Sequence, residues 1–160
     1  MTAEPHPEPP RRRAAPSSAR RAVRRGERTL MNRQRAVAVR PRALGAFLAT
    51  ACDMVLPRAA AVAVCFVTDA EIARLNETYR GKRGPTDVLS FPAEPPGGGD
   101  IAISPAAARR NARSLGRSVY DELRVLILHG VLHLAGYDHE TDNGRMDRRE
   151  RTLRRRLGIA

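Results

Sequence analysis

Cysteine, histidine and long apolar runs are scarce in this 160-residue chain, and each shortage excludes a class of protein. The two cysteines, Cys52 and Cys65, form neither a Cys-x2-Cys zinc pair nor a disulfide framework, so we expect two buried thiols in a reducing compartment. No apolar run is long enough to span a bilayer. The residues before Thr29 lack the apolar central segment of a secretory signal. These absences predict a soluble, cytoplasmic protein that is not bound to a membrane.

Three of the four histidines fall within one segment of eleven residues, HGVLHLAGYDH, from His129 to His139. His129 and His133 are four residues apart, a spacing that places two side chains on one face of a helix. Gly136 is a suitable end for that helix, because glycine adopts the left-handed conformation that reverses the chain and brings His139 round. Three neutral imidazoles leave one tetrahedral position open, which is typical of a catalytic zinc site. We therefore predict that these histidines bind one Zn²⁺ per chain.

The spacing of the histidines, with a glycine three residues after the second, is also typical of metzincin metalloproteases. Those enzymes carry a glutamate directly after the first histidine, and this glutamate is their general base. In this chain the position is Gly130, which has no side chain. A metzincin-like metalloprotease therefore stays as an alternative, but one that lacks its base.

Positive charge is concentrated near the N-terminus of the chain, whose formal net charge is +12 at pH 7. Residues 1–42 contain twelve arginines and three glutamates. Residues 1–30 are rich in proline, arginine, alanine and serine and have no apolar period. We expect them to be a disordered basic extension, followed by a single domain over residues 31–160. A basic arm suits a polyanion such as RNA, although a solvated arm without a partner has the same composition.

Apolar periodicity and capping residues predict an α+β domain. Short apolar runs predict four strands, at residues 35–39, 61–67, 86–91 and 100–104, with a loop rich in proline and glycine at 92–99. Helical spacing, with Thr68, Ser104 and Ser118 as N-caps, predicts helices at 43–56, 69–80, 105–115, 119–135 and from about residue 143. The histidine-bearing helix is the most apolar. We therefore expect a small mixed four-stranded sheet packed with about five helices, with this helix at the centre.

Four segments, in this order, resemble the YbeY-type endoribonuclease family of rRNA maturation factors. They are LNETYRGK (75–82), PTDVLSFP (85–92), GDIAIS (99–104) and the histidine segment (129–139). The resemblance begins at about Val37 and leaves out residues 1–30. It implies a zinc-dependent, single-strand-specific endoribonuclease that acts in 16S rRNA 3′-end maturation and ribosome quality control. It also implies the 16S rRNA precursor as substrate, and the small ribosomal subunit and its assembly factors as partners.

The resemblance also implies roles for individual residues. The three histidines of the segment are its metal ligands, and Arg80 is its catalytic arginine. A guanidinium suits this role because it can bind two oxygens of a phosphodiester at once. Lys82 and Arg83 are expected to contact further phosphates, with solvated surface charge as the alternative for all three. An outward stripe on the helix at 105–115 and just beyond it also suits a phosphate backbone: Arg109, Arg110, Arg113 and Arg117.

The sequence does not identify a general base. Asp87 and Asp100 flank predicted strands near the glycine-rich loop and are candidates, while each also suits a cap or a turn. The 2′-hydroxyl of the RNA is an alternative nucleophile, with zinc acting only as a Lewis acid. Asp138, next to His139, is expected to orient an imidazole. A non-catalytic, zinc-stabilised ribosome-binding module stays open beside the nuclease and the protease.

Overall fold

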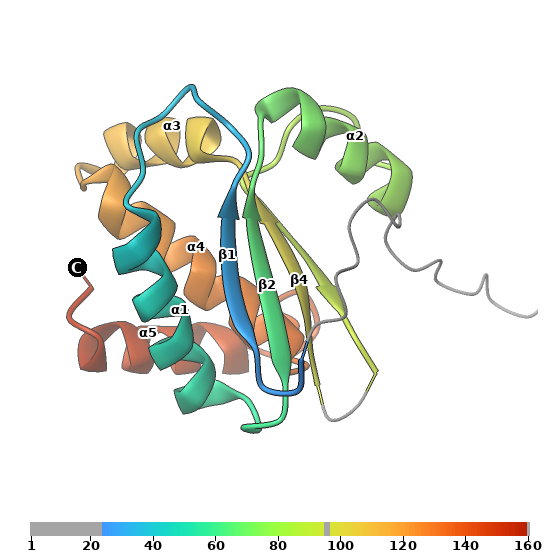
Figure 1. Ribbon diagram of the computed structural model, residues 1–160, viewed down its shortest axis with the longest axis vertical. Helices are drawn as coiled ribbons and strands as arrows, with labels where there is room; N and C mark the ends of the chain where they lie inside the picture. The colour runs from blue at the N-terminus through green and yellow to red at the C-terminus, as the bar shows by residue number, and fades with distance from the viewer. Residues whose placement is uncertain (1–23, 95–96, 160) are drawn as a thin grey trace, which may run out of the picture.

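The computed structural model describes residues 24–94 and 97–159, which form an α+β domain (Figure 1). In chain order its elements are β1 (Arg28–Asn32), α1 (Pro41–Val55), β2 (Ala61–Phe66), α2 (Asp69–Arg80), β3 (Val88–Pro92), β4 (Gly98–Ile103), α3 (Pro105–Leu115), α4 (Val119–Leu134) and α5 (Arg145–Arg156). Within these ranges no helix is both long enough and apolar enough to cross a membrane.

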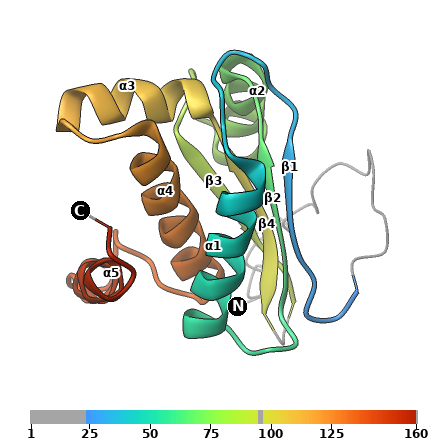
Figure 2. The same cartoon turned by 60° about the vertical axis from the view of Figure 1, so that its left-hand side comes forward.

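The four strands form one mixed sheet in the order β1-β2-β4-β3. β1 is parallel to β2 and β2 to β4, whereas β3 runs antiparallel to β4. This sheet and the five helices of the described residues confirm the predicted α+β class and the mixed four-stranded sheet. Figure 2 shows α1, α4 and α5 on one side of the sheet.

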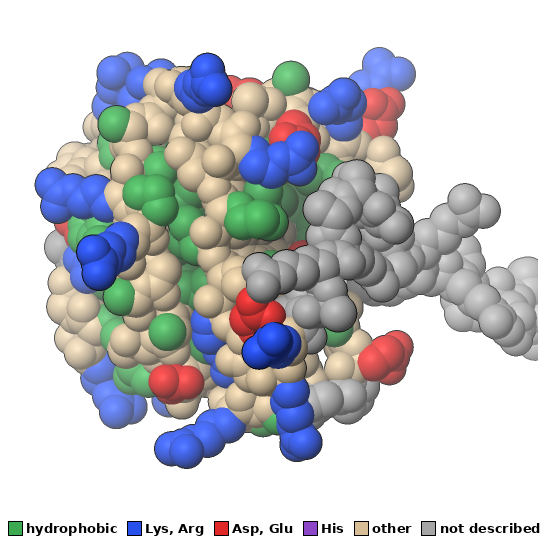
Figure 3. All heavy atoms as spheres, viewed as in Figure 1, with side chains coloured by type: hydrophobic (Ala, Val, Ile, Leu, Met, Phe, Trp, Pro, Cys, Tyr) green, Lys and Arg blue, Asp and Glu red, His purple; other side chains and the backbone are tan. Residues whose placement is uncertain are grey.

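Alternation of side chains along the strands separates two apolar clusters. The larger one packs every second residue of β2, from Val62 to Phe66, and Ile101 of β4 against α1 and α4. The smaller one lies on the opposite face, where Ile72 of α2 packs on side chains of β3 and β4. Figure 3 shows that the face seen in Figure 1 carries apolar side chains near its centre and basic ones mainly around its rim. Most of the core therefore lies between the sheet and the layer that contains α4.

Local capping defines the ends of several helices. The side-chain oxygens of Thr68, Ser104 and Ser118 each accept a hydrogen bond from the amide three residues later, at the starts of α2, α3 and α4. Gly81 and Gly116 end α2 and α3 in the left-handed conformation, each with φ 64°. These five positions confirm the helix boundaries predicted from the sequence.

The strand predicted at residues 35–39 is wrong. This segment is a loop that the Gln34 side chain holds: Nε2 donates to the Val37 carbonyl and Oε1 accepts from the Val37 amide, both at 2.9 Å. The edge strand is instead β1, which pairs with β2 from Arg28 opposite Val62 onward. The domain therefore begins before residue 31, because β1 lies partly within the predicted extension. Residues 1–23 of that extension lie outside the described residues.

The loop predicted at residues 92–99 is shorter than expected, because β3 and β4 extend into it. Pro92 pairs with Gly99 at the end of the antiparallel ladder. Gly98 lies so close to β2 that a Cβ would stand 2.2 Å from the Ala61 carbonyl oxygen. Glycine is therefore needed here for close strand packing as well as for chain reversal.

Candidate metal centre

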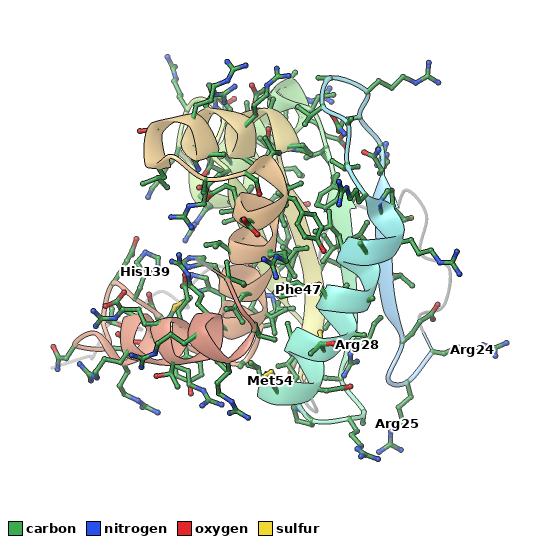
Figure 4. The ribbon with its side chains drawn as sticks, turned by 90° about the vertical axis from the view of Figure 1, so that its left-hand side faces the viewer. Arg24, Arg25, Arg28, Phe47, Met54 and His139 are labelled. Carbon is green, nitrogen blue, oxygen red and sulfur yellow. The ribbon has the colours of Figure 1, made fainter. Side chains whose placement is uncertain are left out.

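α4 presents two half-buried histidines, His129 and His133, on one face near its C-terminal end. The chain leaves the helix through Gly136, whose φ is 95°, and brings the exposed His139 beside them. The three ring centroids are 4.8 to 5.4 Å apart. Figure 4 shows His139 above α5, on the side of the sheet where α4 lies. The structure thus brings together the three histidines that the sequence singled out.

The ring nitrogens of the three histidines converge closely enough to share one ion. His133 Nε2 lies 3.1 Å from His129 Nε2 and 3.3 Å from His139 Nδ1. A tetrahedral zinc with bonds of about 2.0–2.1 Å would hold its ligand nitrogens about 3.3 Å apart. Unprotonated nitrogens at this spacing repel one another through their lone pairs unless a cation lies between them. The cluster, whose ligand atoms all lie within 4.8 Å of one another, therefore fits a metal ion.

Glu150 of α5 fixes the orientation of His129. Its Oε2 lies 2.9 Å from His129 Nδ1, so Nδ1–H donates to the carboxylate and Nε2 keeps its lone pair toward His133. Sequence reasoning missed this role. A signal was present, because Glu150 shares the inward stripe of α5 with the buried Met146 and Leu153, where a carboxylate needs a partner.

We expect the Glu150→Ala variant to bind zinc about 10- to 100-fold more weakly than the wild type, because His129 loses the group that sets its tautomer. Competition with a chelating dye measures this affinity. The matched control is Asp147→Ala on the same helix, whose exposed carboxylate is paired with Arg151 at 2.9 Å. Equal zinc affinity in the two variants would remove Glu150 from the site.

Asp138 holds the turn that carries His139. Its Oδ1 accepts from the Glu140 amide and its Oδ2 from the Thr141 hydroxyl, each at 3.0 Å, and these bonds lower the pKa of Asp138. The carboxylate therefore orders the backbone, whereas Glu150 provides the bond to an imidazole. Burial, followed by the charges of the neighbouring imidazoles, lowers the pKa of His133. A lowered pKa favours neutral imidazole, the form that binds a metal.

Gly130 faces the sheet and not the histidine cluster. A Cβ at this position would lie 2.8 Å from Cγ2 of Ile101, a fully buried side chain of β4. The Ser90 hydroxyl of β3 donates to the Gly130 carbonyl at 3.3 Å and joins the same turn of α4 to the sheet. A glutamate here would direct its carboxylate into the apolar core. The fold therefore leaves no room for the metzincin base at its usual position.

Arg80 is the exposed last residue of α2, and Lys82 and Arg83 follow in an exposed turn. The turn is held by Asn76, whose Nδ2 donates to the Gly84 carbonyl at 3.0 Å. Within the described ranges none of the three basic side chains has a hydrogen bond or an ion pair with the protein. All three are thus available to an external anion, and among the described residues no hydrogen bond or ion pair joins them to the histidines.

Packing contacts connect the C-terminal ends of α2 and α4. Tyr79, which precedes Arg80, packs edge-on against Phe91 of β3 with ring centroids 5.2 Å apart. At the same end of the β3–β4 pair, a Cβ on Gly99 would lie 3.1 Å from Cδ2 of Leu134, the last residue of α4. The helix ends that carry Arg80 and the histidines therefore meet the same end of this strand pair.

Neither aspartate that the sequence offered as a base lies beside the imidazoles. Asp87 accepts from the Val88 amide at 2.8 Å and from Asn111 Nδ2 at 3.0 Å, which joins the start of β3 to α3. That is the opposite end of β3 from Phe91 and Pro92, where the strand pair meets the C-terminal ends of α2 and α4. Asp100 precedes Ile101, whose side chain packs on Gly130 of α4, so strand alternation directs the Asp100 carboxylate to the other face of the sheet.

Most arginines of the stripe predicted on α3 and just beyond it form ion pairs or hydrogen bonds with other residues of the domain. Three of its four members are bonded within the domain: Arg110 to Asp69 at 2.8 Å, Arg117 to Glu122 at 3.4 Å, and Arg109 to the Ala36 carbonyl at 3.4 Å. Among the described residues, only Arg113 of the stripe is exposed without such a bond. Because two of its four charges are paired with carboxylates, the stripe offers RNA phosphates less uncompensated positive charge than the sequence suggests.

Comparison with known proteins relates the chain to one family. Residues 29–158 match the family model described as endoribonuclease YbeY. The endoribonuclease YbeY of Solibacter usitatus is 53% identical over 91 residues, which cover 57% of this chain and 62% of that protein. The protein of the same name from Nautilia profundicola is 50% identical over 94 residues, or 57% of this chain and 68% of the relative. The chain thus spans just under two thirds of the length of the Solibacter relative.

A solved structure supports the same relationship at the level of the fold. The solution structure of TM1509 from Thermotoga maritima superposes with a TM-score of 0.58 at 30% sequence identity. The match covers 78% of this chain and 85% of that one.

Proposed function

The chain belongs to the endoribonuclease YbeY family, and on this premise we propose that it is a metal-dependent endoribonuclease, a hydrolase that cleaves phosphodiester bonds in RNA. The observation that carries the proposal is the convergence of His129, His133 and His139 on one point. Three neutral ligands leave the full positive charge of a divalent ion uncompensated. Such a site attracts an anionic phosphodiester more strongly than a neutral peptide.

The residues of the chain hold the metal and orient the substrate. The three imidazoles bind the ion, and Glu150 keeps His129 in the tautomer that presents Nε2. When bound, the metal supplies Lewis acidity toward a phosphoryl oxygen. We assign Arg80 as the catalytic cation, because its guanidinium can bind two non-bridging oxygens and offset the charge that develops on them. Lys82 and Arg83 bind neighbouring phosphates and position the strand.

We further propose that the ion is zinc, with one per chain, because small clusters of imidazoles suit tetrahedral zinc. Single-stranded RNA is the favoured substrate, since a flexible backbone reaches half-buried imidazoles more easily than a stiff duplex does. Family membership supports a cytoplasmic role in 16S rRNA 3′-end maturation and ribosome quality control. In that role the 16S precursor is the substrate, and the small ribosomal subunit and its assembly factors are the partners.

Two features of the site weigh against the alternative functions. Gly130 is directed at Ile101, so a metzincin-like protease has no base at its required position. In the part of the chain that the structure describes, no fourth histidine, cysteine or carboxylate joins the cluster. An open position suits catalysis, whereas structural zinc sites have four protein ligands.

Incubation of the purified protein with three substrates tests the proposal: single-stranded RNA, duplex RNA of the same sequence and an unfolded protein, each with and without a chelator. We expect cleavage of single-stranded RNA only, loss of that cleavage with the chelator, and recovery on addition of zinc. Electrophoresis of each mixture over time gives the rates.

Chelator-sensitive proteolysis with intact RNA would replace the nuclease by the protease. RNA binding without cleavage of any substrate would favour the ribosome-binding module. Cleavage that persists after complete metal removal would contradict the metal-dependent mechanism.

A further inference from the structure

α5 is the most basic element of the described structure, and its few acids are already occupied. The helix carries seven arginines, one aspartate and one glutamate. Glu150 is bound to His129 at 2.9 Å, and Asp147 is paired with Arg151 at 2.9 Å. No carboxylate of α5 is left to neutralise the other arginines of the helix. The outward side of α5 is therefore strongly positive.

Four exposed arginines of the helix form what we call the α5 arginine face: Arg145, Arg148, Arg155 and Arg156. Met146 and Leu153 anchor the helix in the core. Arg148 follows Met146 by two residues and Arg155 follows Leu153 by two residues. Each arginine therefore points about 200° around the helix axis from its buried neighbour, toward the outward side. The face extends about 16 Å along the helix. This length is sufficient for several phosphates of one strand.

The α5 arginine face begins at the metal centre. Glu150 binds a ligand histidine, so α5 is in direct contact with the site. Arg145, at the start of the helix, lines a cavity of about 260 Å³ together with Tyr137 and Asp138, the two residues before His139. Its guanidinium lies 5.7 Å from the centre of the Tyr137 ring. An anionic strand that follows the face therefore reaches the turn that carries His139.

No comparable surface is offered by the other arginine-rich helix. Two of the four arginines of the α3 stripe are paired with carboxylates, Arg110 with Asp69 and Arg117 with Glu122, whereas Arg109 is bonded to a neutral carbonyl. On the α5 arginine face, Arg148 donates to the Asn143 carbonyl at 3.2 Å, a neutral acceptor that leaves its charge unpaired. Arg155 and Arg156 have no bond of this kind within residues 24–94 and 97–159. Phosphates consequently meet more uncompensated charge on the α5 arginine face than on the α3 stripe, where two of the four arginines are paired with carboxylates.

We propose that the α5 arginine face binds the phosphate backbone of single-stranded RNA and directs the strand to the histidine cluster. The inference rests on the proposed ribonuclease function and identifies the surface that the substrate occupies outside the metal centre. Guanidinium groups bind phosphate through paired N–H donors, and contacts to the backbone position a strand without reading its sequence. α5 thus contributes affinity, while the chemistry stays with the histidines and Arg80.

The test compares two triple variants of the metal-loaded protein that lose the same charge. The first is Arg148→Ala/Arg155→Ala/Arg156→Ala on α5. The matched control is Arg35→Ala/Arg58→Ala/Arg74→Ala, which removes three exposed arginines elsewhere. Fluorescence anisotropy measures binding to a labelled single-stranded 2′-O-methyl RNA at several salt concentrations, with a gel to check that the probe stays intact. Zinc content and melting temperature are measured for each protein.

The logarithm of the binding constant falls linearly with the logarithm of the salt concentration. We expect this dependence to be less steep in the α5 variant, with a slope smaller in magnitude by about 2, because each lost phosphate contact on a single strand accounts for about 0.7. Between 50 and 200 mM salt, the wild type should then lose about 20-fold more affinity than the α5 variant loses. With cleavable RNA, KM should rise while kcat stays unchanged, because a contact made equally in ground and transition states affects binding alone. The control should match the wild type in slope and KM.

Each outcome separates the inference from the function on which it rests. Cleavage by the wild type, with equal slopes in the α5 variant and the control, overturns the α5 assignment and leaves the ribonuclease proposal intact. A fall in kcat with unchanged KM also overturns it, because the arginines would then act in the chemical step. A wild-type protein that neither binds nor cleaves RNA overturns both proposals.

Discussion

The His133→Ala variant should lose most of its zinc and at least about 100-fold of its ribonuclease activity. His133 Nε2 is the atom that both other histidines approach, at 3.1 and 3.3 Å, so its loss leaves two donors that no longer enclose an ion. Metal content by elemental analysis and RNA cleavage on the same preparation measure the two effects together. His133→Asn, which keeps a planar polar side chain, should lose zinc to a similar extent.

The fold should survive this change, because His133 is only half-buried and lies outside the main apolar cluster. A melting temperature within a few degrees of that of the metal-free wild type would show that the loss is local. Full zinc stoichiometry in the folded His133→Ala variant would mean that the ligand assignment is wrong.

Arg80→Ala should retain its fold and its zinc yet lose about 100- to 1,000-fold in kcat, the range seen when one group that stabilises transition-state charge is removed. The side chain is exposed at the end of α2, so truncation opens no cavity. Arg80→Lys should recover little activity, because an ammonium is a point charge that does not hold two phosphate oxygens in a fixed geometry. Single-turnover cleavage rates measure the chemical step directly.

Arg74→Ala is the matched control, since Arg74 is an exposed arginine of the same helix, six residues before Arg80. It should cleave RNA like the wild type. Lys82→Ala and Arg83→Ala should raise KM severalfold with little change in kcat, as expected for contacts that position the backbone. Wild-type turnover in Arg80→Ala would make Arg80 an ordinary solvated cation.

Local signals in the sequence determined where several elements begin and end. Ser118 accepts from the amide of Asp121, and Gly81 ends α2 with a positive φ, and both effects act within a few residues of chain. The spatial arrangement of the histidines was predictable for the same reason. Eleven consecutive residues contain the whole cluster, because helical spacing and one glycine turn are sufficient to bring the three rings together.

The edge of the sheet could not be predicted from local alternation. Residues 35–39 alternate as well as many strands do, but the Gln34 side chain satisfies the Val37 backbone and stabilises a loop. β1 forms instead at Arg28–Asn32, because its partner β2 lies more than thirty residues away in the sequence and the pairing belongs to the assembled sheet. Strand propensity depends on such neighbours more than helix propensity does.

What surrounds the histidines was decided only by the tertiary structure. Glu150 reaches His129 across 21 residues of sequence, and Gly130 turns toward Ile101 because α4 packs closely on β4. The arginines show the same difference. The sequence places positive charge on α3, just beyond it and on α5, but only the fold brings Asp69 to Arg110 of α3 and Glu122 to Arg117. The sequence by itself therefore determined the chemistry that adjacent residues can perform. Packing between distant segments decided which groups orient that chemistry and which charges remain for a substrate.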